Sequence, residues 1–332
     1  MTFRDVPNRV DFPAQEQELL KFWKENKSFQ KMRQIHQGEP AWSFIDGPIT
    51  ANNPMGVHHG WGRTYKDLMQ RFRTMQGHEL RYQNGFDCQG LWVEVEVEKE
   101  KGFKSKKDIE AYGLKGFVQE CKARVLRYAA IQTEQSIRLG YWMDWNEPGN
   151  LRMLAEKLLE DQQQVITVEG PDGPVTATVE QVVGLLGMAE LGGSYFTFAT
   201  ENNYMIWAFL KKCWEHGWVY RGVDVMPWCP RCATGISQHE IVTDGYAELT
   251  HKSVTVRFPL RGSNGQVRQD TQTGLPEALL VWTTTPWTLS SNVAAAVGPE
   301  LTYAKVRQGE EVFYLAKGTL NMLKGAYEVL GS

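Results

Sequence analysis

The chain has 332 residues, with 36 basic and 39 acidic side chains and a formal net charge of −3. This length allows two or three domains, and the near balance of charge gives no global basic field that would point to nucleic acid. The polar N-terminus lacks an apolar signal segment, and no stretch approaches the ~20 apolar residues of a membrane span. Five scattered cysteines do not suggest a disulfide framework, so we expect a cytoplasmic protein with no membrane partner.

The N-terminal part of the sequence alternates between helix and strand patterns. Apolar residues recur at helical spacing over 13–35, and 41–45 reads as a short buried strand that runs into a turn at 46–48. A loop rich in Gly and Asn over 50–62 leads into a second helix, and a further strand is expected over 80–86. This βαβ pattern predicts a parallel sheet.

The remainder of the chain changes character twice. A long amphipathic helix is predicted over 114–139, and helical spacing returns near Ile206. Beyond Tyr220 the chain becomes rich in strand patterns, with candidate strands over 253–258, 278–284, 303–307 and 311–316. A shift of composition near Val225 predicts a domain boundary. The domain plan predicted from these changes is a helical extension over 1–40, the first half of an α/β domain over 41–146, a small surface insertion containing a hairpin over 147–193, a helical part over 194–224 and a β-rich domain over 225–332.

Two adjacent histidines, His58 and His59, lie in the glycine-rich loop between the first predicted strand and the following helix. Such a loop lets the backbone approach a phosphate, and the helix N-terminus adds a favourable field. Histidine side chains there can donate hydrogen bonds to phosphate oxygens during transfer. The loop is neither a Walker loop nor a G-x-G-x-x-G turn. Taken alone, a His-His pair favours a structural role, so its chemistry depends on context.

Asp87 follows the predicted strand over 80–86. Open α/β sheets bind ligands at the carboxyl ends of their strands, where this carboxylate can pair with a substrate ammonium group. Asp87 can also cap the helix that follows it. Both roles remain open from the sequence.

Cys229 and Cys232 form a Cys-x-x-Cys pair, which can hold Zn²⁺ through two thiolates. A structural zinc site normally needs four ligands; His239 is within range, and no second pair follows. A zinc site and a knuckle that is free of metal or completed by residues outside this chain are both compatible with the sequence.

Three consecutive threonines, Thr283, Thr284 and Thr285, end a predicted strand. Their hydroxyls can bind a sugar hydroxyl or position a water molecule. Threonine is also a common strand residue, and the run by itself favours that structural explanation.

Together, these segments resemble class I aminoacyl-tRNA synthetases of the isoleucine type. The run from Met55 to Gly62 resembles their His-Ile-Gly-His signature in two alternative alignments, each of which retains one of its two histidines. The pair Lys66-Asp67 resembles the residues that commonly follow this signature.

Three further segments carry the same resemblance. The run 85–94 resembles Gly-Trp-Asp-x-His-Gly-Leu-Pro-(Ile/Val)-Glu, with Gln89 and Trp92 in place of His and Pro. The run 227–240 resembles the family's entry into an inserted domain, and the run 281–292 resembles the threonine-rich editing motif of the isoleucine enzymes. Two segments therefore favour the same amino acid.

The resemblance implies an α/β fold, in which the first half of a Rossmann-like catalytic domain is followed by an inserted, β-rich and incomplete editing domain. It implies activation of isoleucine by ATP with Mg²⁺ and transfer to tRNA(Ile), by a protein that is monomeric at full length. Isoleucine and valine differ by one methylene, which supplies only about 1–3 kcal/mol of discrimination between the two amino acids. Hydrolytic editing of mischarged valine is therefore expected. For catalysis the resemblance implies His58 and His59, and for binding of ATP and the adenylate it implies Gly47, Pro48, Gly56, His58, His59, Gly60 and Lys66. The amino acid would be bound by Pro48 and Asp87. Editing would depend on Thr283, Thr284 and Thr285, and zinc would be held by Cys229 and Cys232.

Several elements of the family are missing, among them a Lys-Met-Ser-Lys-Ser loop, so we expect the N-terminal portion of such an enzyme, inactive by itself. Alternatives are a leucine- or valine-type synthetase, a non-catalytic RNA- or zinc-binding module on the same scaffold, and a generic nucleotidyltransferase. The last of these explains nothing after residue 225.

Overall fold

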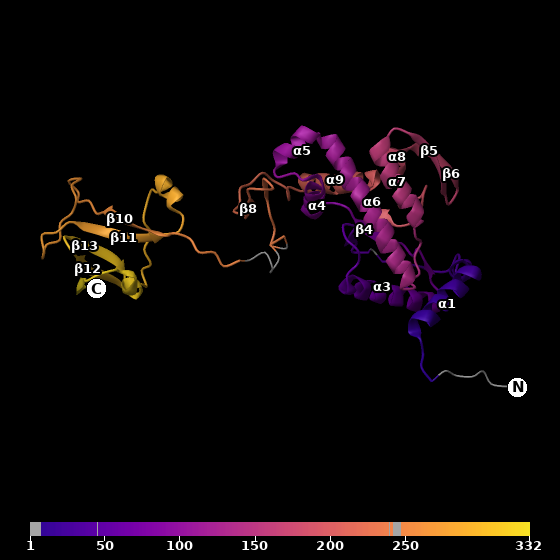
Figure 1. Ribbon diagram of the computed structural model, residues 1–332, viewed down its shortest axis with the longest axis horizontal. Helices are drawn as coiled ribbons and strands as arrows, with labels where there is room; N and C mark the ends of the chain where they lie inside the picture. Colours follow the sequence, from indigo (N-terminus) through magenta and orange to yellow (C-terminus); the bar gives the residue numbers. More distant parts are fainter. Residues whose placement is uncertain (1–7, 45, 239, 242–246) are drawn as a thin grey trace. The chain divides into compact units, whose positions relative to one another are not determined.

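The computed structural model describes residues 8–44, 46–238, 240–241 and 247–332. The chain forms two compact units, one ending at Ser237 and the other starting at Gln238 (Figure 1). This division lies later in the chain than the change of composition near Val225. Within the described ranges, none of the helices has the length and apolar character needed to cross a membrane.

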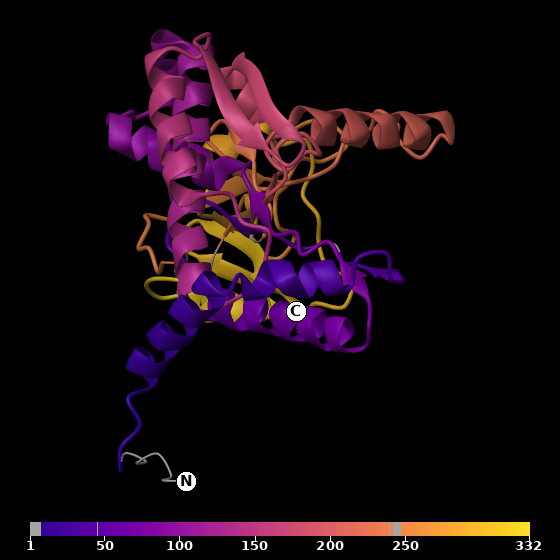
Figure 2. The same cartoon turned by 90° about the vertical axis from the view of Figure 1, so that its right-hand side faces the viewer.

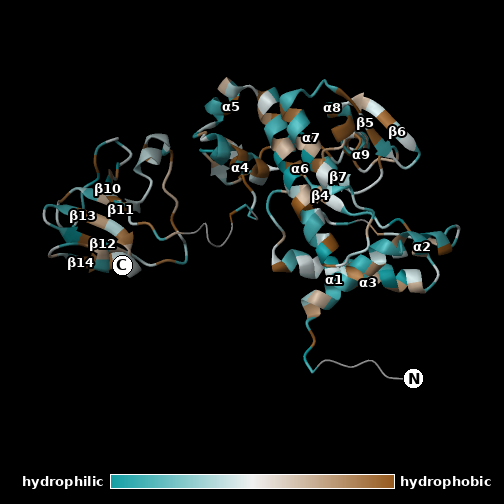
Figure 3. Ribbon diagram, turned by 45° about the vertical axis from the view of Figure 1, so that its right-hand side comes forward, coloured by the Kyte–Doolittle hydropathy of each residue, from teal (hydrophilic) through white to brown (hydrophobic). Residues whose placement is uncertain are grey.

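The first unit combines long helices with short strands, and Figure 3 shows hydrophilic and hydrophobic residues mixed along helices such as α6. Its helices are α1 (Phe12–Glu25), α2 (Ser28–Ile35), α3 (Val57–Met75), α4 (Leu91–Lys101), α5 (Lys106–Tyr112), α6 (Leu114–Arg138), α7 (Pro148–Glu160), α8 (Val179–Gly184) and α9 (Thr200–Glu215). Its strands are β1 (Ala41–Trp42), β2 (Ile49–Thr50), β3 (Glu79–Leu80), β4 (Gly85–Asp87), β5 (Val165–Gly170), β6 (Gly173–Thr178), β7 (Tyr195–Phe196), β8 (Trp228–Cys229) and β9 (Thr234–Gly235).

The predicted parallel sheet is confirmed, although it is built from very short strands. Strands β2, β4 and β7 pair in parallel in that order, and β1 pairs in parallel with β3. In this register Thr50 lies opposite Asp87, and Phe86 lies opposite Phe196. The carboxyl ends of β2 and β4 therefore meet at one edge of the sheet.

Two predicted elements are interrupted by residues with positive φ. Lys27 has φ of 50°, and the helix expected over 13–35 is divided there into α1 and α2. Tyr82 has φ of 55° and lies between β3 and β4, which divide the strand expected over 80–86. A left-handed backbone is rare at non-glycine residues and fits neither a right-handed helix nor a strand.

The segment 147–193, predicted as a small surface insertion, contributes two helices to the core. Helix α7 buries Leu151, Leu154, Ala155 and Leu158 in the main hydrophobic cluster, at the spacing of one helical face. This face packs against α6, beside which α7 runs in Figure 1. Helix α8 adds three buried valines to the same cluster. The segment is part of the core because its apolar residues form continuous stripes.

Helix α9 has the expected helical pattern but not the expected burial. Only Cys213 is buried among its residues, while Trp207 and Trp214 are 70% and 65% exposed. Figure 2 shows this helix projecting away from the rest of the first unit. Its apolar residues surround the helix rather than forming a single stripe.

The second unit contains a five-stranded sheet with the order β10-β11-β13-β12-β14. Strands β11 and β13 are parallel, and the other neighbours are antiparallel. The four predicted strands are confirmed to within one residue at each end, whereas β14 was not predicted. Its elements are β10 (Val254–Pro259), β11 (Glu277–Thr283), η2 (Pro286–Ser291), β12 (Tyr303–Gln308), β13 (Glu311–Ala316), η3 (Lys317–Met322) and β14 (Glu328–Gly331).

Candidate functional site

The two histidines lie in the first turn of α3 rather than in the predicted loop. The helix starts at Val57, after Gly56, because the backbone N–H of Gly56 donates to Nδ1 of His59 at 3.1 Å and so supports the first turn. The rings of His58 and His59 are 3.9 Å apart between centroids. A Cβ on Gly56 would lie 3.0 Å from Cε1 of His58, so a glycine suits this position.

The environment of His59 favours an uncharged ring. Partial burial lowers its pKa, and the neighbouring charges of His58 and Arg63 lower the pKa further. His59 is half-buried, whereas His58 is exposed. An uncharged imidazole therefore lies at the N-terminus of α3, where the helix dipole favours anions.

The turn before β2 meets α3 through Lys66 and Asp46. The Lys66 ammonium forms an ion pair with the buried Asp46 carboxylate, and its Nζ also lies 3.2 Å from the carbonyl oxygen of Gly47. The second Asp46 oxygen accepts from the backbone N–H of Gly85 at 3.3 Å. One carboxylate thus joins the predicted ATP-binding residues Gly47 and Lys66 to strand β4. Pro48 follows directly and is half-buried.

Asp87 ends β4 next to β2 and does not cap the following helix, whose N-cap is Gly90. Its carboxylate accepts from the hydroxyl of Thr50 at 3.0 Å and from the backbone N–H of Gln89 at 3.4 Å. No cationic side chain of the described residues forms an ion pair with it. A half-buried carboxylate at the carboxyl end of a parallel strand is thus available to an ammonium group.

Three residues near this edge were not predicted from the sequence as site residues: Asp46, Arg63 and Tyr195. Tyr195 comes from β7 and donates from its hydroxyl to the backbone oxygen of Asp46 at 2.6 Å. Burial raises its pKa, and the charge of Asp87 raises it further. No local pattern marks Tyr195, because 110 residues separate it from Gly85, its partner in the sheet register. Asp46 precedes the predicted site residues Gly47 and Pro48 in the turn over 46–48, but no role was predicted for the acid itself.

The Cys229 and Cys232 pair sits on a tight hairpin of β8 and β9. The backbone N–H of Cys232 donates to Sγ of Cys229 at 3.4 Å, and this contact lowers the pKa of the Cys229 thiol. His239 lies outside the described residues. Across the described ranges, no group of three or more His, Cys, Asp or Glu side chains is placed to hold a metal. Two thiolates alone do not fit a structural zinc site.

The threonine run lies between β11 and η2 in the second unit. The hydroxyl of Thr283 accepts from the backbone N–H of Thr285 at 3.0 Å, so it serves a local turn. Thr284 is exposed and has no hydrogen-bond partner among the described residues. The hydroxyl of Thr284 is therefore the one of the three that is most available to a ligand.

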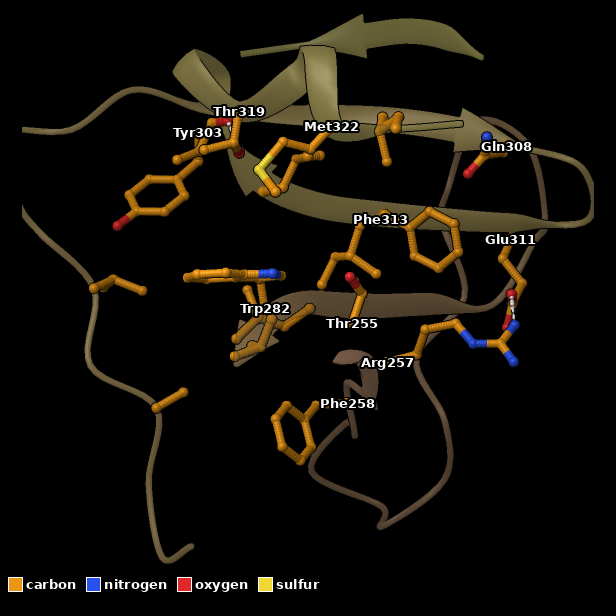
Figure 4. A pocket seen from close by; sticks show the side chains of 18 of the residues that line it. Thr255, Arg257, Phe258, Trp282, Tyr303, Gln308, Glu311, Phe313, Thr319 and Met322 are labelled. Atoms are coloured by element: carbon orange, nitrogen blue, oxygen red, sulfur yellow. Dashed lines mark hydrogen bonds and ion pairs between the residues drawn. The ribbon is translucent and has the colours of Figure 1, made fainter. Parts of the chain in front are cut away.

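A pocket of about 1000 Å³ opens on the same unit (Figure 4). The side chains of Trp282, Phe313 and Met322 point into it, and the Arg257–Glu311 ion pair lies at one end. The threonines do not themselves line the pocket, although Trp282 and Asn292, on either side of 283–291, do. The threonine run therefore belongs to the segment 283–291, which connects two lining residues.

The sequence also resembles proteins of known family. Residues 18–168 and 175–306 match the model of the tRNA synthetases class I (I, L, M and V). The chain is 37% identical to isoleucine–tRNA ligase of Streptomyces coelicolor over 96% of its own length and 25% of that protein. It is 37% identical to the Thermus thermophilus ligase over 97% of its own length and 26% of that protein, and 33% identical to the Pyrococcus horikoshii ligase over 99% and 26%.

The chain spans about a quarter of the length of these curated relatives. The family match, by contrast, covers most of the chain and includes the α3 N-terminus, Asp87 and the threonine run. The mixed α/β structure of the chain is consistent with this family match. The chain belongs to the class I tRNA synthetases of the I, L, M and V group.

Proposed function

We propose that the protein activates isoleucine with ATP and Mg²⁺ to isoleucyl-adenylate, and then transfers the aminoacyl group to tRNA(Ile). The observation that carries this proposal is the carboxylate of Asp87, which has no cationic partner among the described residues at the edge formed by β2 and β4. The ammonium group of a free amino acid supplies the missing charge. The similarity to isoleucine–tRNA ligases supports isoleucine as that amino acid.

The triphosphate would lie at the N-terminus of α3. The side chains of His58 and His59 offer hydrogen-bond donors there, Gly56 and Gly60 leave room for a phosphate group beside them, and the helix dipole favours negative charge. Gly47, Pro48 and Lys66 would line the adjoining side, joined by the ion pair of Lys66 with Asp46.

Attack of the isoleucine carboxylate on the α-phosphorus breaks the bond to pyrophosphate, so the site needs positioning and charge stabilisation rather than a covalent enzyme intermediate. Pro48 would also contact the amino acid, as would Asp87. The parallel strands β2, β4 and β7 support a Rossmann-like arrangement for this domain.

For the second unit we propose a place in an editing domain that hydrolyses valine mischarged to tRNA(Ile). Thr283, Thr284 and Thr285 would position the terminal ribose or the attacking water, with the exposed hydroxyl of Thr284 as the main contact. The neighbouring pocket next to Trp282 supports ligand binding on this side of the unit. We assign no step to zinc, because Cys229 and Cys232 alone do not form a complete site.

Amino-acid-dependent exchange of pyrophosphate into ATP tests the proposal on the protein that contains this sequence. We expect exchange with isoleucine to exceed exchange with valine and leucine. Preference for leucine or valine would replace the isoleucine assignment, and no exchange with any amino acid would favour a non-catalytic module.

The variant Asp87→Asn isolates the carboxylate. Loss of one charge-assisted hydrogen bond, about 1.5–3 kcal/mol, predicts that isoleucine binds roughly 10- to 150-fold more weakly. Asp172→Asn, in the exposed turn between β5 and β6, is the control and should bind isoleucine normally. Equal effects of the two variants would contradict the role of Asp87.

A further inference from the structure

Arg63 is a buried cation that has no acidic partner among the described residues. It lies on α3, one helical turn after His59, and is 1% exposed. Its Nη1 donates to the hydroxyl of Ser136 on α6 at 2.6 Å and lies 3.4 Å from Sδ of Met55. Its guanidinium also lies 5.7 Å from the centre of the Phe86 ring. All of these contacts are electrically neutral.

The remaining donors of Arg63 are unused among the described residues. Its Nε and Nη2 atoms are buried and have no hydrogen-bond partner there. Burial lowers the pKa of Arg63 to about 10, which still leaves the guanidinium charged at neutral pH. An uncompensated buried charge is costly, and neighbouring groups experience its field in a medium of low dielectric constant. The residue therefore acts on its surroundings as an unscreened positive charge.

The contact between Gly56 and His59 defines the protonation of the His59 ring. A backbone N–H can only donate, so Nδ1 of His59 must accept and carry no proton. A neutral ring then holds its one proton on Nε2. Protonation of Nδ1 would set two donors against each other at 3.1 Å.

Positive charge near His59 opposes such protonation. The ionisable groups that act on this region are His58 and Arg63 on α3, and Tyr141 from the segment after α6. The Tyr141 hydroxyl donates to the backbone oxygen of Gly60 at 2.6 Å. His58 is exposed, whereas Arg63 is buried and carries the permanent positive charge of the three.

We propose that Arg63 is a positioning residue that keeps His59 uncharged with its proton on Nε2, so that His59 offers a fixed N–H donor to an anionic phosphate group. The phosphate part of this inference rests on the proposed ATP site; the effect on His59 does not. The positive charge of Arg63 acts on His59 through its electric field, whereas the hydrogen bond to the phosphate is donated by His59 itself.

The titration of His59, followed by NMR on the 332-residue chain with isotope-labelled histidine, tests the proposal directly. We expect wild type to show the Nε2–H form and a pKa below that of a free histidine. Arg63→Met and Arg63→Gln remove the charge and should raise the pKa of His59. Arg63→Lys retains the charge and should restore the wild-type pKa.

Two further variants separate charge from structure. Ser136→Ala removes the hydrogen-bond partner of Arg63 but not its charge, and should leave the titration of His59 unchanged. Arg127→Met removes an exposed charge from α6 and should also have no effect. The proposal is overturned if His59 titrates identically in wild type and in a folded Arg63→Met or Arg63→Gln protein. It is also overturned if Arg63→Lys folds and titrates like the uncharged variants.

Binding of ATP with Mg²⁺, measured by calorimetry on the same variants of the protein that contains this sequence, tests the phosphate part. We expect Arg63→Met to bind ATP at least several-fold more weakly than Arg63→Lys at pH 7. If wild type does not bind ATP, the proposed ATP site fails while the titration of His59 still decides the role of Arg63. If all variants bind ATP equally while the titration of His59 shifts, Arg63 still controls the charge of His59. The role of His59 as a donor to phosphate is then contradicted.

Discussion

The backbone of Gly85 lies directly against the ring of Tyr195, so that a Cβ built on Gly85 would overlap with Cζ of Tyr195. The two residues are also register partners in strands β4 and β7. Because the Tyr195 hydroxyl reaches the backbone oxygen of Asp46, the glycine allows one side chain to join the sheet to the turn before β2.

Replacing Gly85 by alanine should therefore displace the Tyr195 ring. We expect Gly85→Ala to lower the free energy of unfolding by about 1–3 kcal/mol, as for other overpacked sites. Chemical denaturation measures this change. Gly149→Ala in α7 is the matched control, because a Cβ there meets nothing within 4 Å. A Gly85→Ala protein as stable as this control would contradict the close contact.

The adjacent residues Leu158 and Leu159 test the place of α7 in the core. Leu158 is 2% exposed, whereas Leu159 is 37% exposed. Leu158→Ala should cost about 2–5 kcal/mol of stability through lost burial and an unfilled cavity. Leu159→Ala should cost clearly less, and denaturant unfolding compares the two. Similar small costs would instead support a loosely attached surface insertion over 147–193.

The cysteines should differ in reactivity with iodoacetamide. Burial raises the pKa of Cys88 and of Cys121 to about 12, whereas hydrogen bonds from Cys232 lower the pKa of Cys229. Since the thiolate is the nucleophile, Cys229 should be alkylated well before Cys88 and Cys121 at pH 7.5. Mass spectrometry of peptides over a time course gives the order of modification. Zinc bound by a completed site would instead protect both Cys229 and Cys232.

The second unit should lose stability in acid through Asp270. A hydrogen bond from Lys305 lowers the pKa of Asp270 to about 2, and Thr273 contributes in the same direction. A carboxylate with a lowered pKa in the folded state stabilises that state above its ordinary pKa of 3.8, and this stabilisation is lost as the pH falls towards 2.

The variant Asp270→Asn isolates this effect. Its melting temperature should lie below that of wild type at pH 6, and the difference should shrink between pH 4 and pH 2. Thermal unfolding followed by calorimetry measures both proteins. A difference that stays constant over this range would show that the charge of Asp270 does not stabilise the fold.

Local sequence patterns determined most of the secondary structure and the chemistry of the candidate residues. Strands β10 to β13 of the second unit and the long helix α6 follow from apolar periodicity, which depends only on neighbouring residues. The strand, glycine-rich segment and helix around His58 and Asp87 predicted a parallel sheet for the same reason. The resemblance of these segments to known motifs supplied the family.

Tertiary structure decided which residues meet. Arg63 is buried beside Ser136, and Tyr195 reaches Asp46, through contacts between segments 73 and 149 positions apart. It also decided that α7 belongs to the core while the apolar surface of α9 is exposed. A sequence pattern shows that a residue is apolar or charged, but burial and field depend on partners brought together only by the folded chain.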